Sequence, residues 1–173
     1  MKKIITSSLC AAALLLTACD QKTPPSAPPD KNVSSQQSNN LSHKTTQDIA
    51  TDLQKIETLS DSKTQQALDF QKQINEAAQS QNQTRLQDTV NQMQSYVQQF
   101  NLDLDGLALK SSEVAALREK IKQSNLLGLA LAQEGIKTAP DQNVMNDLQS
   151  KASQLQQSLL QDLQQLEQQA KSK

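Results

Sequence analysis

The stretch that decides the fold is MNDLQSKASQLQQSLLQDLQQLEQQA, residues 145–170. Its apolar residues recur in steps of three and four, the spacing that places side chains on one face of an α-helix. The positions between them are mostly glutamine, serine and charged residues, as on a solvated face. The stretch therefore predicts a long amphipathic helix, with a buried face of Met145, Leu148, Ala152, Leu155, Leu159, Leu163, Leu166 and Ala170.

Three earlier stretches show the same spacing. Their apolar residues are Ile49, Leu53, Ile56, Ala67, Phe70, Ile74 and Ala77, then Leu86, Val90, Met93, Val97 and Phe100, and then Val114, Leu117, Ile121 and the run 126–132. The first two stretches differ in phase, and Ser80 and Asn82 between them are good N-caps. We therefore predict a break within residues 79–84. One continuous helix is the alternative, because that segment contains neither Gly nor Pro.

The ends of the last two helices carry recognisable capping residues. Ser111 and Ser112 are the predicted N-caps of the third helix. Gly135 is predicted to end that helix as a C′ glycine. Thr138 is predicted to cap the fourth helix, with Pro140 in its first turn.

The composition fits a helical protein. Only 2% of the 173 residues are aromatic, with 3 Gly and 5 Pro, whereas glutamine makes up about a sixth of the chain. So few turn-forming and bulky strand residues argue against sandwich, barrel and α/β folds. Short connections make neighbouring helices antiparallel. We therefore predict an all-α fold, an up-down antiparallel bundle of about four helices over residues 45–173.

The first residues have the features of a secretory signal peptide. Lys2 and Lys3 are followed by a short apolar run, residues 4–16, which is well below the ~20 residues of a membrane span. We therefore predict a signal peptide over residues 1–18, which is removed from the mature protein.

The signal ends in Leu16-Thr17-Ala18-Cys19, which resembles the lipobox of bacterial lipoproteins. The resemblance implies cleavage before Cys19 and acylation of this cysteine. An ordinary cleaved signal peptide with a chance cysteine is the alternative. Asp20 resembles the residue that retains enteric lipoproteins in the inner membrane, a rule that varies between bacteria. The expected location is the envelope, facing the periplasm, at the inner or the outer membrane.

Residues 19–44 read as a disordered linker. Pro24-Pro25 and Pro28-Pro29 oppose helix formation, and only Val33 and Leu41 are large apolar residues. The segment would hold the bundle away from the membrane.

The sequence lacks the residues of common active sites. His43 is the only histidine, and after acylation of Cys19 and loss of Cys10 no thiol remains. A catalytic triad and a histidine or cysteine metal site are therefore not expected. Losing residues 1–18 removes two lysines and no acid, which changes the formal charge from −1 to −3 and disfavours nucleic acid as a partner. We predict no enzymatic activity and no cofactor.

One segment, residues 101–106, resembles the start of an EF-hand calcium loop. Asn101, Asp103 and Asp105 occupy its positions 1, 3 and 5, and Gly106 occupies position 6. Position 12 should be Glu but is Ser112. The other interpretation is a turn between two helices, stabilised by Asp and Gly.

Two features allow either a structural or a binding interpretation. The run Leu126-Leu127-Gly128-Leu129-Ala130-Leu131-Ala132 is apolar on every face, which favours a place in the core over a groove for a lipid or a partner helix. The glutamines favour solvated helix faces over coiled-coil association.

The terminal Lys173 resembles the lysine by which the murein lipoprotein, another helical chain with a cysteine anchor, is joined to peptidoglycan. The leading hypothesis is a lipid-anchored bundle that binds an envelope protein or acts as a scaffold. A structural element bound to peptidoglycan and a calcium-dependent binding module are the alternatives.

Overall fold

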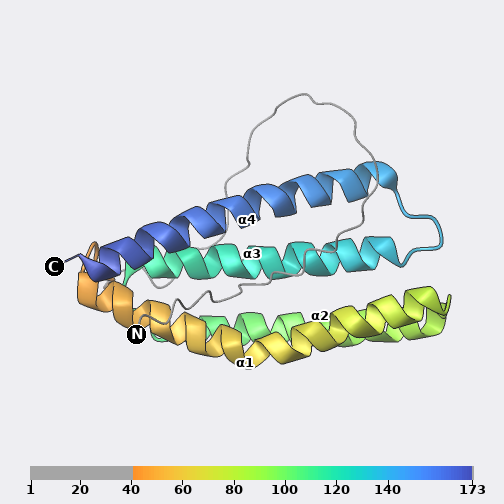
Figure 1. Cartoon of the computed structure of the whole chain (residues 1–173), viewed down its shortest axis with the longest axis horizontal. Helices are drawn as coiled ribbons and strands as arrows, with labels where there is room; N and C mark the ends of the chain where they lie inside the picture. Colours follow the sequence, from red (N-terminus) through yellow and green to blue (C-terminus); the bar gives the residue numbers. More distant parts are fainter. Residues whose placement is uncertain (1–40, 173) are drawn as a thin grey trace, which may run out of the picture.

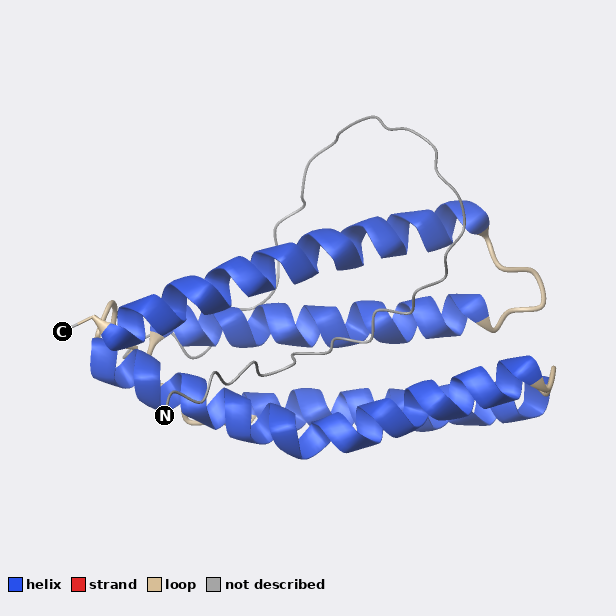
Figure 2. Ribbon diagram, in the orientation of Figure 1, coloured by secondary structure: helices blue, strands red, loops and turns tan. Residues whose placement is uncertain are grey.

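The computed structural model describes residues 41–172. They form four α-helices: α1 Thr46–Gln79, α2 Gln83–Asp105, α3 Ser112–Gly135 and α4 Gln142–Lys171 (Figures 1 and 2). The described range contains no strand, only one isolated parallel bridge between Ser42 and Ser111. The predicted all-α class is confirmed, and so is the break within residues 79–84.

The helices form an up-down bundle. α1 packs against α2 and α4, and α3 packs against the same two helices, whereas α1 and α3 meet only across the diagonal. The start of α1 and the end of α4 lie at one end of the bundle, and the α1–α2 turn and the α3–α4 loop lie at the other (Figure 1). None of the described helices is both long and apolar enough to cross a membrane.

The core has two parts. Near the start of α1, all four helices contribute to a cluster of Ile49, Ile56, Phe100, Leu104, Val114, Leu117, Ile121, Leu159 and Leu166. Toward the other end, a second cluster is built on Val90, Val97, Leu129 and Ala132. Residues of α1, α2 and α3 make up or pack against this second cluster, and none comes from α4. Consistent with this, α4 and α1 diverge toward that end (Figure 1).

Of the predicted N-caps, Asn82 of α2 and Ser111 of α3 are confirmed, whereas Ser80 is the C-cap of α1 and Ser112 is the first residue of α3. Asn82 accepts a hydrogen bond from the backbone N–H of Arg85 (2.9 Å), and the Ser111 hydroxyl accepts one from Val114 (3.3 Å). Both bonds satisfy amides that the first helical turn leaves without partners.

The predicted end of α3 is wrong in detail. Gly135 is the last helical residue, and no glycine in the described part has a positive φ. The C-cap is Ile136, whose N–H donates to the carbonyl of Ala132 (3.2 Å) in a right-handed conformation. The helix therefore ends in a tight turn that needs no left-handed residue.

The predicted start of α4 is also wrong. The N-cap is Asp141, and both Thr138 and Pro140 lie outside the helix. The Asp141 carboxylate accepts hydrogen bonds from the backbone N–H groups of Asn143 (2.8 Å) and Val144 (3.3 Å). A charged acceptor that binds two amides is a stronger cap than a threonine hydroxyl.

Candidate functional sites

Residues 42–44, immediately before α1, are fastened to the start of α3, and we call them the clip. The N–H of Ser42 donates to the carbonyl of Lys110 (2.7 Å), and the N–H of Ser112 donates back to the carbonyl of Ser42 (3.0 Å). Lys44 has a left-handed φ of 55°, which is uncommon for a non-glycine residue. The folded part of the chain thus includes the clip, three residues that the sequence assigned to the linker.

Glu113 is the acceptor at the centre of the clip. Its carboxylate lies 2.7 Å from Nδ1 of His43 and accepts hydrogen bonds from the Lys44 N–H (2.9 Å) and the hydroxyls of Ser111 (2.8 Å) and Ser112 (3.2 Å). Burial raises the pKa of Glu113, but these donors outweigh it and lower the pKa from 4.5 to about 2. The histidine of the predicted linker is therefore held on α3 by an ionised carboxylate.

Asp52 is fully buried at the same end of the bundle. Its Oδ2 accepts hydrogen bonds from the backbone N–H groups of Lys110 and Ser111, and its Oδ1 accepts one from Nζ of Lys55 (2.8 Å). Lys55 also donates to the carbonyl of Ala108 (2.6 Å). Burial raises the pKa of Asp52, but the Lys55 and backbone hydrogen bonds outweigh it, so the pKa lies below its ordinary value.

Glu134 is the second buried carboxylate, near the opposite end of the bundle. It accepts hydrogen bonds from Nζ of Lys137 and from the backbone N–H of Asp141 (2.9 Å). The Lys137 bond, followed by the Asp141 bond, holds the pKa of Glu134 below its ordinary value. This carboxylate therefore ties the α3–α4 loop together.

Neither the candidate calcium loop nor the alternative of a turn over residues 101–105 is formed, because α2 continues to Asp105. Asn101, Asp103 and Asp105 lie in the last turns of α2, where alternate residues point in different directions. Lys63 Nζ lies 2.7 Å from Asp103, and Lys122 Nζ lies 2.6 Å from Asp105, so the two carboxylates have separate partners on different helices. Within residues 41–172 no three His, Cys, Asp or Glu side chains are grouped as metal ligands would be. The structure therefore does not bring the three candidate ligands together.

The apolar run 126–132 belongs to the core only on its inner face. Leu129 and Ala132 are buried in the second cluster, whereas Leu126 is 53% exposed. A Cβ added to Gly128 would meet no atom within 4 Å, so this glycine is not required for close helix packing. The prediction of a central helix is wrong for the outward face.

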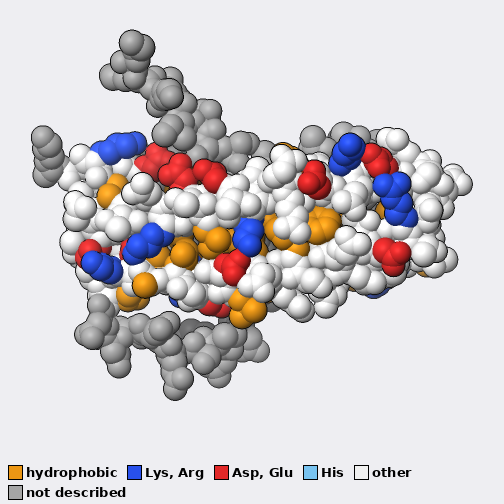
Figure 3. All heavy atoms as spheres, turned by 90° about the horizontal axis from the view of Figure 1, so that it is seen from below, with side chains coloured by type: hydrophobic (Ala, Val, Ile, Leu, Met, Phe, Trp, Pro, Cys, Tyr) orange, Lys and Arg blue, Asp and Glu red, His pale blue; other side chains and the backbone are white. Residues whose placement is uncertain are grey.

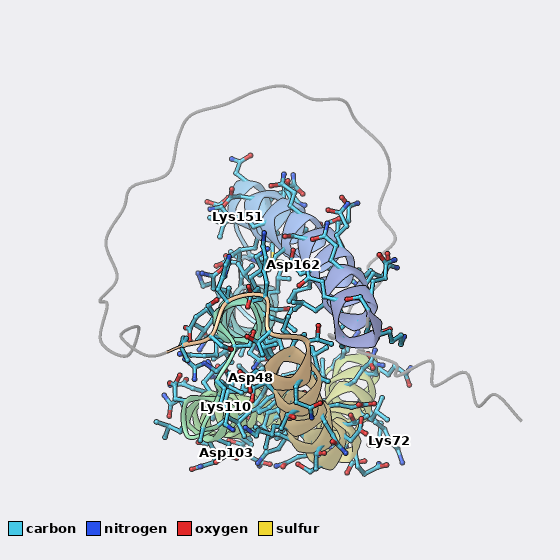
Figure 4. The ribbon with its side chains drawn as sticks, turned by 90° about the vertical axis from the view of Figure 1, so that its left-hand side faces the viewer. Asp48, Lys72, Asp103, Lys110, Lys151 and Asp162 are labelled. Atoms are coloured by element: carbon cyan, nitrogen blue, oxygen red, sulfur yellow. The ribbon has the colours of Figure 1, made fainter. Side chains whose placement is uncertain are left out.

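That outward face forms one wall of an open furrow of about 710 Å³ between α3 and α4. We call it the α3–α4 furrow, and it is lined by Gln123, Leu126, Leu127, Ala130, Lys151, Gln154 and Leu155. Lys151 is the only charged residue of this lining, and its Nζ lies 2.7 Å from the Asp147 carboxylate, one helical turn away. A view along the bundle shows Lys151 on the α4 side, far from Lys72 and Asp103 on the α1–α2 side (Figure 4).

The face formed by α1 and α2 differs from the α3–α4 furrow in how its exposed apolar side chains are distributed. Hydrophobic side chains show there as a broken line along the long axis, between uncharged polar side chains and scattered charges (Figure 3). Leu68 on α1 and Leu102 on α2 are the large apolar residues of these two helices that are most exposed, at 46% and 63%. Neither of them lines the α3–α4 furrow.

The remaining candidate residues, Cys19, Asp20 and Lys173, lie outside the described residues. Lipidation, membrane sorting and linkage to peptidoglycan therefore stay predictions. Close to the C-terminus, Lys171 pairs with Glu167 over one helical turn (3.5 Å).

Comparison with protein families links the bundle to lipoproteins. Residues 50–173 match the family model described as uncharacterised lipoprotein PM1805. The matched range includes α2, α3, α4 and most of α1, and it excludes the lipobox. No curated protein and no solved structure matches the chain. Because the family model covers most of the chain, the protein belongs to the uncharacterised lipoprotein PM1805 family.

Proposed function

We propose that this lipoprotein is a lipid-anchored, periplasm-facing module that binds a protein partner and catalyses no reaction. Two independent features support the anchor. The motif Leu16-Thr17-Ala18-Cys19 resembles a lipobox, and the family match rests on residues 50–173, which lie outside that motif. Two or three acyl chains on Cys19 would anchor the protein stably, whereas one chain gives only marginal binding.

The observation that carries the binding role is the α3–α4 furrow. Its walls are mainly apolar, and Leu126 presents about half of its surface to solvent. Helical grooves of this kind bind amphipathic helices through their apolar faces.

Three hydrogen-bonded carboxylates support a non-catalytic role. Asp52, Glu113 and Glu134 each accept a hydrogen bond from a backbone amide, and each has a pKa below its ordinary value. A general acid or base works best with a pKa near the ambient pH. These groups therefore serve as caps and loop ties rather than as proton-transfer groups.

Photocrosslinking in cells that express the full chain tests the binding role. A benzoylphenylalanine at position 126 should give a crosslinked protein product, since it would lie in the furrow. The matched control is position 68, because Leu68 is similarly exposed (46% against 53%) and lies outside the furrow. Equal products from both positions, or none from position 126, would contradict the proposal.

The lipid anchor has its own test. Replacing Cys19 by Ser should release the protein from the membrane fraction. If the enteric sorting rule applies, Asp20→Ser should move the protein from the inner to the outer membrane. Density fractionation of the envelope measures both effects.

A further inference from the structure

The clip binds a site that other residues hold in place. From inside the bundle, the Asp52 carboxylate accepts hydrogen bonds from the N–H groups of Lys110 and Ser111. From outside, Ser42 exchanges backbone hydrogen bonds with Lys110 and Ser112. Figure 4 looks onto this end of the bundle, where Lys110 marks the connection between α2 and α3. The site that receives the clip therefore keeps its shape whether or not the clip is bound.

The clip has little besides hydrogen bonds and one ion pair to hold it there. The His43 side chain is 71% exposed, and Lys44 is exposed as well. The first buried residue of α1 is Ile49. Thr45 joins the clip to α1 as its N-cap, and its side chain makes no capping hydrogen bond. Release of the clip would therefore cost α1 neither a side-chain cap nor a buried contact of Ile49.

The bound clip also carries backbone strain. Lys44 has a φ of 55°, which is unfavourable for a residue with a Cβ. It is held in this conformation by the bond from its N–H to the Glu113 carboxylate (2.9 Å). Release would relieve the strain, and the carboxylate would still accept hydrogen bonds from the hydroxyls of Ser111 and Ser112.

The contacts of the clip are interlocked. The Ser42 carbonyl accepts hydrogen bonds from both the N–H (3.0 Å) and the hydroxyl (3.1 Å) of Ser112. That hydroxyl also lies 3.1 Å from Nδ1 of His43, which in turn lies 2.7 Å from the Glu113 carboxylate. Because neighbouring residues of the clip share these partners, loss of one contact weakens the next.

We propose that the clip is a two-position latch, which Glu113 holds closed and which opens as a unit while all four helices stay folded. Exposed hydrogen bonds with few buried apolar contacts are typical of segments that open locally. In the closed position the chain enters the fold at the start of α3. In the open position it enters at α1, and residues 42–45 lengthen the preceding segment by at most ~14 Å. The latch thus sets both the point and the reach of attachment.

Hydrogen exchange of single amides, measured by NMR on the full chain in detergent micelles, tests the latch. The N–H groups of Ser42, Lys44 and Ser112 have their acceptors across the contact between the clip and α3. These three amides should share one protection factor, well below that of Ile56 in the core. Exchange of all three only together with Ile56 would overturn the proposal, because the clip would then open only on unfolding.

Glu113→Ala should speed the exchange of Ser42 and Ser112 by roughly tenfold or more. Both amides keep their own backbone acceptors in this variant, so faster exchange reports opening of the clip rather than a lost partner. The amide of Ala115, which donates to the Ser111 carbonyl, should keep its rate because α3 stays folded. Unchanged rates for Ser42 and Ser112, or an equal rise at Ala115, would overturn the latch.

The matched control is Glu119→Ala, an exposed carboxylate on the same helix that pairs with Arg118 and Lys122 and not with the clip. It should leave the clip amides unchanged, and an effect equal to that of Glu113→Ala would overturn the role of Glu113.

A second variant shifts the latch in the opposite direction without removing a contact. Lys44→Gly keeps the N–H that Glu113 accepts and removes the cost of the left-handed conformation. It should slow the exchange of Ser42 and Ser112 several-fold. Unchanged or faster exchange in this variant would contradict a closed position held against backbone strain.

Discussion

Asp52 on α1 and Ser111 at the start of α3 are joined by a buried hydrogen bond between the Asp52 carboxylate and the Ser111 N–H (2.7 Å). The two residues are 59 positions apart in the chain. This contact fixes the α2–α3 connection against α1, at the end of the bundle where the clip also binds.

Replacing Asp52 by Ala should therefore destabilise the protein by about 3 kcal/mol, because the buried amide of Ser111 and the partly buried amide of Lys110 lose their acceptor. Urea unfolding followed by circular dichroism measures the change. Asp61→Ala on the exposed surface of the same helix is the control and should have little effect. Equal stability of the two variants would contradict the capping role of Asp52.

Acid should weaken the folded state between about pH 4.5 and pH 2. The pKa of Glu113 falls from 4.5 in the unfolded chain to about 2 in the folded one, so folding favours its ionised form. Its contribution is therefore complete above pH 4.5 and is lost as the pH falls through 2. A shift of this size corresponds to about 3 kcal/mol.

The variant Glu113→Gln tests the assignment of this pH dependence. It should be less stable at pH 7 and should lose less stability on acidification than the unaltered chain. Urea unfolding at several pH values provides the measurement. A parallel loss of stability with acid in both chains would show that other carboxylates are responsible, of which Asp52 is the first to examine, since its pKa is also lowered.

Gly128→Ala should raise the stability by about 0.5–1 kcal/mol. This glycine lies inside α3, where alanine is the better helix former, and the added Cβ meets no atom within 4 Å. Gly106→Ala is the comparison, since that glycine is the C-cap of α2 and its Cβ would lie 3.4 Å from the Asp103 carbonyl. A stability loss for Gly128→Ala would mean that the glycine has a packing role.

Two leucines three residues apart on α3 should respond differently to truncation. Leu129→Ala should cost about 2–4 kcal/mol, because this residue is only 7% exposed within the second core cluster. Leu126→Ala should cost less than about 1 kcal/mol in dilute protein, because its side chain is 53% exposed. Similar losses would show that the furrow wall is part of the core.

The helices could be predicted because their signals are local. The spacing from Met145 to Ala170 identifies a buried face, and Asn82 and Ser111 mark the caps that the structure confirms. Caps with a competing residue nearby were harder to predict. Thr138 followed by Pro140 is a familiar start signal, but the stronger acceptor, Asp141, begins the helix.

The contacts at the candidate sites were less predictable than the helices, because each contact joins residues that are far apart in the chain. Nothing near Asp52 indicates that its partner is Ser111, and nothing near His43 indicates that Glu113 would bind it. The division of the run 126–132 into a buried and an exposed side depends on the direction of α4, which local periodicity does not contain. The spacing of Asn101, Asp103 and Asp105 was misleading because α2 continues through it.

The pairing of Ser42 with the start of α3 has a mechanical consequence. Tension applied to the chain before Leu41 would load the hydrogen bonds of Ser42 with Lys110 and Ser112 before it loads the first turn of α1. Tension is thereby shared with a second helix instead of unwinding the first from its end. We therefore expect the clip to protect the first turn of α1 from tension on the chain that precedes it.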